Sequence, residues 1–75
     1  MKFYHLMSEM TRETISRHVT LQAAVRAKVR HAKRMRKKLG DGAFFPCVIR
    51  WDGFQRIPAA HYALAENALI EAGEI

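Results

Sequence analysis

The sequence is poor in the residue types that mark secreted and membrane-spanning proteins. It has one cysteine, Cys47, among 75 residues, so it cannot form an intrachain disulfide, and small secreted domains usually depend on several. No apolar run approaches the roughly 20 residues that a membrane-spanning helix requires. The segment from Lys2 to Met7 is too short and too polar for a signal peptide. We therefore expect a cytoplasmic protein that does not contact membranes.

The sequence also lacks the spacings of metal sites and catalytic centres. Its four histidines stand far apart, whereas zinc ligands typically come in closely spaced pairs. The loop Gly40-Asp41-Gly42 lacks the third glycine and the following Lys-Ser or Lys-Thr of a phosphate-binding loop. Cys47 and His61 are the one nucleophile and base pair of interest, but Cys47 falls in an apolar run, where a thiol is usually inert. We expect no enzyme, no cofactor and no metal.

Acidic residues are missing from one segment where basic residues are concentrated. The stretch from Arg26 to Lys38 holds eight of the chain's 13 lysines and arginines, and the formal net charge is +6. An ordinary solvated helix face mixes the two signs of charge. This segment therefore indicates a polyanionic partner. Its eight cations are Arg26, Lys28, Arg30, Lys33, Arg34, Arg36, Lys37 and Lys38.

The first twenty residues predict a β-hairpin. Residues 2–7 are aromatic or apolar without helical spacing, and residues 14–19 are rich in β-branched types. Residues 8–13 are polar and can form the connection. A single helix starting at Ser8 is the alternative, which we disfavour because Thr and Val are poor helix formers.

A long helix follows, with Thr20 as its N-cap and Gly40 as its left-handed C-terminal residue. Apolar residues recur at steps of three and four, which places them on one stripe facing a core. The stripe comprises Leu21, Ala24, Val25, Val29, Ala32, Met35 and Leu39. The basic residues recur with the same spacing on the other side, so they form a ridge that could follow successive phosphates.

The second half predicts two more strands and a second helix. The apolar run 44–51 ends at Asp52-Gly53, a strong signal for a two-residue hairpin turn, and residues 54–57 form the return strand. Pro58 starts a helix that Gly73 ends, and the segment 57–75 contains glutamates but no lysine or arginine. The apolar face predicted for this helix consists of Ala60, Leu64, Ala65, Ala68, Leu69 and Ala72. The order strand, strand, helix, strand, strand, helix predicts one α+β domain over residues 1–75, with the helices on one face of an antiparallel sheet.

The leading functional hypothesis is a small protein that binds the backbone of DNA or RNA through the long helix. Arg26, Arg30, Lys33, Arg34 and Lys37 would be the main contacts, with Lys28, Arg36 and Lys38 beside them. Trp51, next to a tight turn, is the candidate for stacking on a base.

Two alternatives to nucleic-acid binding remain open. The ridge could be a solvated face that keeps a small protein soluble. It could instead dock on an acidic protein surface, as in an inhibitor or adaptor of the kind that phages and mobile elements encode, for example an anti-CRISPR or other anti-defence protein. A homodimer is a further expectation, with the row Ala60, Leu64, Ala68 and Ala72 as a candidate seam.

Overall fold

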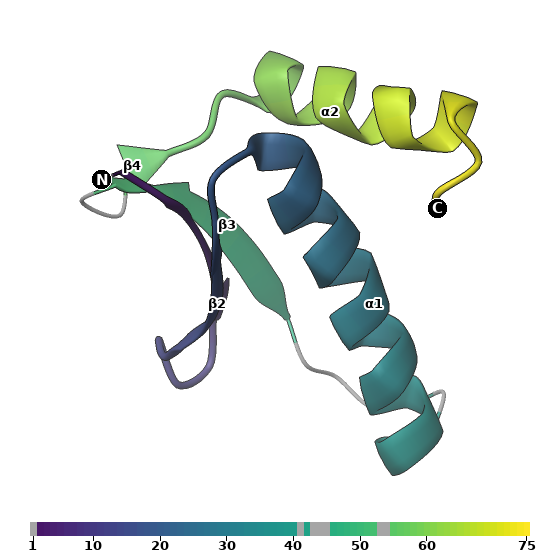
Figure 1. Ribbon diagram of the computed structural model, residues 1–75. Coiled ribbons are helices and arrows are strands. Elements are labelled where there is room, and N and C mark those ends of the chain that lie inside the picture. The colour runs from purple at the N-terminus through teal and green to yellow at the C-terminus, as the bar shows by residue number, and fades with distance from the viewer. Residues whose placement is uncertain (1, 41, 43–45, 53–54) are drawn as a thin grey trace.

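The computed structural model describes residues 2–40, 42, 46–52 and 55–75, and these residues form the predicted α+β domain (Figure 1). The elements are β1 (Tyr4–Ser8), β2 (Thr14–His18), α1 (Leu21–Leu39), β3 (Cys47–Trp51), β4 (Gln55–Arg56) and α2 (Ala59–Glu71). The strands pair antiparallel in one four-stranded sheet, in the order β2-β1-β3-β4. Strand and helix order are as the sequence predicts.

The N-terminal hairpin is confirmed, and the alternative of a helix starting at Ser8 is wrong. Tyr4 lies opposite His18 in the ladder between β1 and β2. The connection is held by backbone hydrogen bonds from Ser8 N–H to the Glu13 carbonyl, at 3.0 Å, and from Arg12 N–H to the Ser8 carbonyl, at 2.8 Å. Arg12 has a φ of 60°, a left-handed conformation that costs a residue with a Cβ about 1–2 kcal/mol.

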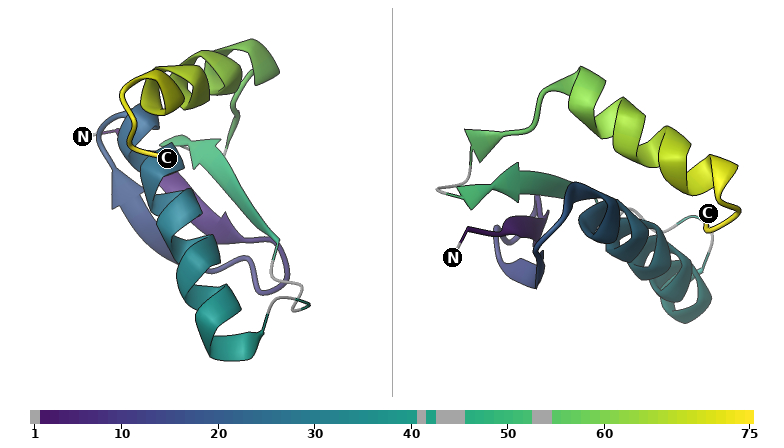
Figure 2. Two further views of the ribbon diagram at one scale, coloured as in Figure 1. Left: turned by 90° about the vertical axis from the view of Figure 1, so that its right-hand side faces the viewer. Right: turned by 45° about the horizontal axis from the view of Figure 1, so that its top comes forward.

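The two faces of the sheet differ in what covers them. Leu6 lies opposite Ile49 in the ladder between β1 and β3, and the two side chains are buried, with 1% and 5% exposed. Their neighbours Met7 and Val48, which also lie opposite each other, point to the other face because side chains alternate along a strand. Both helices lie on the Leu6 side (Figures 1 and 2), and no element of the described chain covers the Met7 side.

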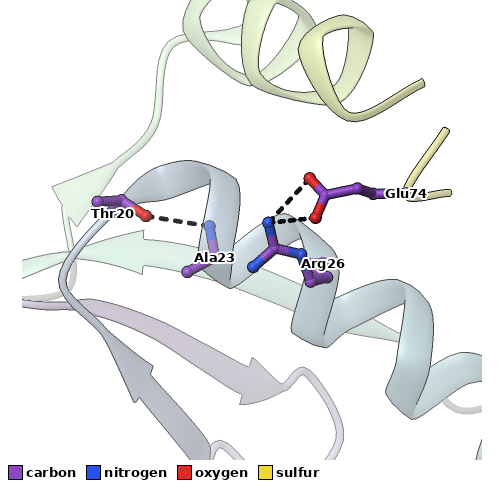
Figure 3. A network of polar contacts seen from close by, with 4 residues as sticks. All are labelled: Thr20, Ala23, Arg26 and Glu74. Atoms are coloured by element: carbon purple, nitrogen blue, oxygen red, sulfur yellow. Dashed lines mark hydrogen bonds and ion pairs between the residues drawn. The ribbon is translucent and has the colours of Figure 1, made fainter. Parts of the chain in front are cut away.

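Local chemistry sets both ends of α1. The Thr20 hydroxyl accepts a hydrogen bond from Ala23 N–H at 3.1 Å (Figure 3), so the predicted N-cap is confirmed. At the other end, Gly40 N–H donates to the Arg36 carbonyl at 2.8 Å. Gly40 has a φ of 94° but a ψ of 161°. Glycine therefore supplies the positive φ that the prediction required, but the residue does not adopt the left-handed helical conformation.

The core is small and lies between the sheet, α1 and α2. Its buried residues are Leu6, Ala24, Val25, Ile49, Ala65 and Leu69. Four residues of the predicted apolar faces lie outside the core, because Leu39 is 56% exposed, Leu64 is 70% exposed, and Ala60 and Ala72 are exposed as well. The last turns of α1 extend past the ends of the strands (Figures 1 and 2), so Leu39 has left the core. On α2 the buried face runs through Ala65 and Leu69, and Leu64 points away from it.

The C-terminus of α2 folds back toward α1. Gly73 N–H donates to the Ile70 carbonyl at 3.0 Å and Glu74 N–H to the Leu69 carbonyl at 2.9 Å, the two hydrogen bonds of a Schellman motif. Gly73 has a φ of 73°, which explains why glycine ends this helix. At the other end Pro58 is the N-cap residue, one position earlier than the first turn in which we expected it.

Some predictions for the second hairpin concern residues outside those described. β3 begins at Cys47 and pairs antiparallel with β4, with Arg50 opposite Arg56 and Trp51 opposite Gln55. β4 is shorter than the predicted return strand of residues 54–57. Gly53 and Phe54 of the predicted turn and strand, Phe44 and Phe45 of the preceding apolar run, and Asp41 of the predicted loop lie outside the described residues.

The packing of α2 predicts unequal effects of two leucine substitutions on the same helix. Leu69→Ala should lower the free energy of unfolding by about 2–5 kcal/mol, because Leu69 is fully buried. Leu64→Ala is the matched control and should change it by less than about 0.5 kcal/mol. Urea denaturation followed by circular dichroism measures both. Equal losses would contradict the orientation of α2 seen here.

Candidate nucleic-acid interface

The eight basic residues of α1 divide into an inner pair and an exposed set. Arg26 and Lys28 are partly buried, while the other six are exposed. The Arg26 guanidinium lies 2.9 Å from the Glu74 carboxylate (Figure 3). The Schellman motif after α2 brings Glu74 to this position. Both side chains stay 30–42% exposed, so the ion pair contributes little stability, but it partly neutralises Arg26.

Lys28 also contacts α2. Its ammonium donates a hydrogen bond to the Tyr62 hydroxyl at 3.3 Å and lies 5.1 Å from the centroid of the Tyr62 ring. The second contact is a cation–π interaction. Arg26 and Lys28 therefore take part in packing α2 onto α1, and they are less available to a partner than the remaining cations.

Five of the exposed cations form one continuous surface, which we call the basic ridge. At 100° per residue they fall within an arc of about 140°, on the side of α1 opposite the buried Ala24 and Val25. The exposed Arg36 lies outside this arc. The ridge consists of Arg30, Lys33, Arg34, Lys37 and Lys38. It occupies the half of α1 that extends past the sheet (Figure 1).

The ridge has a cost for the folded protein. Arg30 and Arg34, Lys33 and Lys37, and Arg34 and Lys38 are like-charged pairs four residues apart, and each such pair destabilises a helix by about 0.2–0.5 kcal/mol. The positive charges in the last turn gain some energy from the helix dipole. Among the described residues, Arg26 and Glu74 form the one ion pair whose nitrogen and oxygen atoms lie within 4 Å of each other. The ridge itself therefore has no internal counter-charge there.

Trp51 does not lie beside the ridge. Its ring packs against Tyr4, with centroids 4.3 Å apart and planes tilted by 48°. It lines a hollow of about 470 Å³ together with Leu21, Pro58 and His61, at the N-terminal end of α1. The ridge occupies the C-terminal half and faces solvent. The structure therefore does not bring the predicted stacking residue and the predicted phosphate contacts together.

A second basic cluster was missed from the sequence. Arg12, Arg50 and Arg56 line an open hollow of about 670 Å³ on the uncovered face of the sheet. The turn signal did not identify this cluster, because a two-residue turn at Asp52-Gly53 would place Arg50 opposite Gln55. The structure instead pairs Arg50 with Arg56 and Trp51 with Gln55, a register that differs from the predicted one by one residue.

The chemistry expected of an enzyme is not assembled at Cys47. Burial raises the pKa of the Cys47 thiol, an effect that Lys28 partly offsets, so little thiolate is present at neutral pH. Cys47 begins β3, whereas His61 lines the hollow beside Trp51 at the other end of that strand, about 13 Å along it. In the part of the chain that the structure describes, no three His, Cys, Asp or Glu side chains gather as metal ligands.

Comparisons with known proteins add no functional assignment. No protein-family model matches the chain, and neither the curated proteins nor the solved structures that were searched contain a match. Neither of the two described helices is long and apolar enough to cross a membrane.

The repulsion along the ridge predicts a stabilising substitution. Lys33→Glu should raise the free energy of unfolding by about 0.5–1 kcal/mol, because it replaces repulsion of Lys37 by an attractive pair four residues apart. Urea denaturation at about 20 mM salt measures the change. At about 0.5 M salt the gain should shrink, since exposed charges are screened. A loss of stability at low salt would contradict this account of the ridge.

Proposed function

We propose that this protein binds the phosphate backbone of nucleic acid through the basic ridge of α1. The observation that carries the proposal is the arrangement of five exposed cations on one helix face, with no acidic partner among the described residues. A phosphate backbone supplies the missing counter-charge along a line, as the ridge requires.

The dimensions of the ridge suit a duplex. From Arg30 to Lys38 the helix rises about 12 Å, at 1.5 Å per residue. Double-stranded DNA carries one charge per about 1.7 Å of its axis. A ridge lying along a groove would thus meet about seven phosphates with five cations. Binding of this kind positions a protein on the backbone and carries no sequence information.

A solvated surface or a role in packing would explain the charge and exposure of the ridge less well. A solvated face needs no uniform sign of charge, and here the uniform sign destabilises the helix. Arg26 and Lys28 show that cations of the same helix can be held by α2, whereas the five ridge residues are exposed. Nucleic-acid binding accounts for both the sign and the exposure of the ridge.

The proposal predicts a steep dependence of affinity on salt. For a duplex of about 20 base pairs, the logarithm of the association constant should fall with the logarithm of salt concentration at a slope of about −4 to −5, if five phosphates are neutralised. The double variant Arg30→Gln/Arg34→Gln should reduce this slope by about 2. Fluorescence anisotropy between about 50 and 300 mM salt measures it.

Lys28→Gln is the matched control for the salt experiment. It removes one positive charge from the same helix, but at a position that contacts Tyr62, so the slope should change by less than about 0.5. A wild-type slope near zero, or equal effects per charge at Lys28 and on the ridge, would contradict binding through the ridge.

A second candidate function is docking on a larger protein as an inhibitor or adaptor. It is favoured by α2, where Leu64 is 70% exposed and Ile70 is 52% exposed, since exposed apolar side chains suit a protein interface. The row named above as a candidate seam, Ala60, Leu64, Ala68 and Ala72, could also join two copies of the chain. Against it, Glu74 is engaged with Arg26, which leaves α2 with less acidic surface for a basic partner.

A nuclease-treated pull-down separates the two candidates. Under the nucleic-acid proposal, material recovered from a lysate with the tagged protein should be lost after nuclease digestion. Leu64→Glu is the companion variant, because it should leave that recovery unchanged. A single protein retained in stoichiometric amount after digestion, and lost in Leu64→Glu, would favour the docking function instead.

A further inference from the structure

The uncovered face of the sheet carries a row of basic side chains that crosses all four strands. Arg17 of β2 lies opposite His5 of β1, His5 lies opposite Arg50 of β3, and Arg50 lies opposite Arg56 of β4. Because these residues share one register position, their side chains share one face. At about 4.8 Å per strand the row spans about 14 Å.

Fold stability does not explain this row. Arg50 and Arg56 lie directly opposite each other, and like charges in that position are destabilising. Neither has an ion-pair partner within 4 Å among the described residues. The sequence thus places two guanidinium groups where they repel each other and, in the described part of the chain, form no ion pair.

Arg12 adds a third cation to the same face at a conformational cost. It holds a left-handed backbone, with a φ of 60°, that glycine would adopt without strain. Arg12 lines the same hollow as Arg50 and Arg56, and the hollow also includes the apolar side chains of Met7 and Val48. The left-handed backbone does not require an arginine, and the side chain adds a positive charge to the hollow.

Apolar and aromatic groups lie among these arginines. Met7 and Val48 are partly buried side chains next to the row, and Arg17 lies over the ring of Phe3, with 5.8 Å from its guanidinium carbon to the ring centroid. The cations on this face are arginines, whose flat guanidinium groups both pair with phosphates and stack on bases.

We propose that the open face of the sheet binds a single-stranded segment of nucleic acid. Arg12, Arg50 and Arg56 contact its phosphates, and its bases lie on Met7 and Val48. An open sheet with basic and apolar side chains suits unpaired bases, which expose flat apolar surfaces as well as charge. A duplex buries its bases and would use the charges alone. Glu9 also lines the hollow, and its carboxylate repels any anion, so the three arginines supply the net positive charge there.

This site goes beyond the proposed function of the ridge. It uses residues that the ridge does not, and its hollow lies on the uncovered face of the sheet. Val48, Arg50 and Arg56 also line a neighbouring hollow with Lys28 and Tyr62, but none of the five ridge residues lines either hollow. Either proposal can therefore fail while the other stands.

The test compares single-stranded and duplex oligonucleotides. Fluorescence anisotropy at about 50 mM salt is measured with a labelled oligodeoxythymidine of about 12 nucleotides and with a duplex of equal length. The variant Arg50→Gln/Arg56→Gln should bind the single strand about tenfold more weakly, with less than about a twofold loss for the duplex. The control Arg30→Gln/Arg34→Gln removes the same charge from the ridge and should weaken duplex binding more than single-strand binding.

Two outcomes would overturn the proposal. One is an equal loss of single-strand affinity in both double variants, which would show an effect of net charge alone. The other is unchanged single-strand affinity in Arg50→Gln/Arg56→Gln. If the protein does not bind the duplex but Arg50→Gln/Arg56→Gln still weakens binding of the single strand, the function proposed for the ridge is rejected and the sheet site stands.

Arg12→Gly separates binding from folding. Glycine relieves the left-handed strain, so the melting temperature should stay the same or rise, while single-strand affinity falls by roughly threefold. Reduced affinity in a protein that is at least as stable cannot come from misfolding. Unchanged affinity in this variant would remove Arg12 from the site.

Two further probes test the contact with bases. An abasic sugar-phosphate strand of the same length should bind at least about fivefold more weakly than oligodeoxythymidine, and equal binding would overturn the stacking on Met7 and Val48. Thymidine monophosphate should compete poorly at equal nucleotide concentration. Effective competition would identify a free nucleotide as the ligand and overturn the assignment to a strand.

Discussion

The contact between α1 and the sheet determines which surfaces of this protein are available to a partner. Ala24 and Val25 are fully buried in a core that they share with Leu6 and Ile49 of the sheet and with Ala65 and Leu69 of α2. A chain of 75 residues has enough apolar surface for one such layer. The outer side of α1 and the far face of the sheet consequently remain exposed, and both carry cations that form no ion pair among the described residues.

The positions of the charges follow from how α2 packs. Its C-terminal Schellman motif brings Glu74 to Arg26, and Tyr62 contacts Lys28. Both contacts lie in the N-terminal half of α1, because α2 crosses the helix there (Figure 2). Glu74, which follows α2, thus partly neutralises the packed end of α1, whereas the cations of the projecting end form no ion pair among the described residues. The division between structural and available cations is a property of tertiary packing.

The sequence predicted what depends on local chemistry. The Thr20 cap, the positive φ of Gly40 and the antiparallel pairing of β3 with β4 are set by nearby residues, and these predictions held. The register of β3 and β4 differs by one residue from that of the predicted two-residue turn. Exposure of a helix residue depends on where the neighbouring elements end and on which side of the helix they cover. Periodicity alone therefore wrongly placed Leu39 and Leu64 in the core. The row on the open face was missed because it depends on the register of all four strands. β1 pairs with β3, which is distant in the chain, so local sequence does not predict their register.

The two basic surfaces have different physical characters. The ridge is a convex helix face whose neighbours are solvent and more charge, so its attraction for a polyanion is electrostatic and falls steeply with salt. The sheet face combines arginines with Met7 and Val48 around a hollow, where interactions with apolar groups persist at high salt. Because α1 and the sheet lie between them, neither surface can substitute for the other in binding. Salt dependence and strand preference are therefore separable properties of this one small domain.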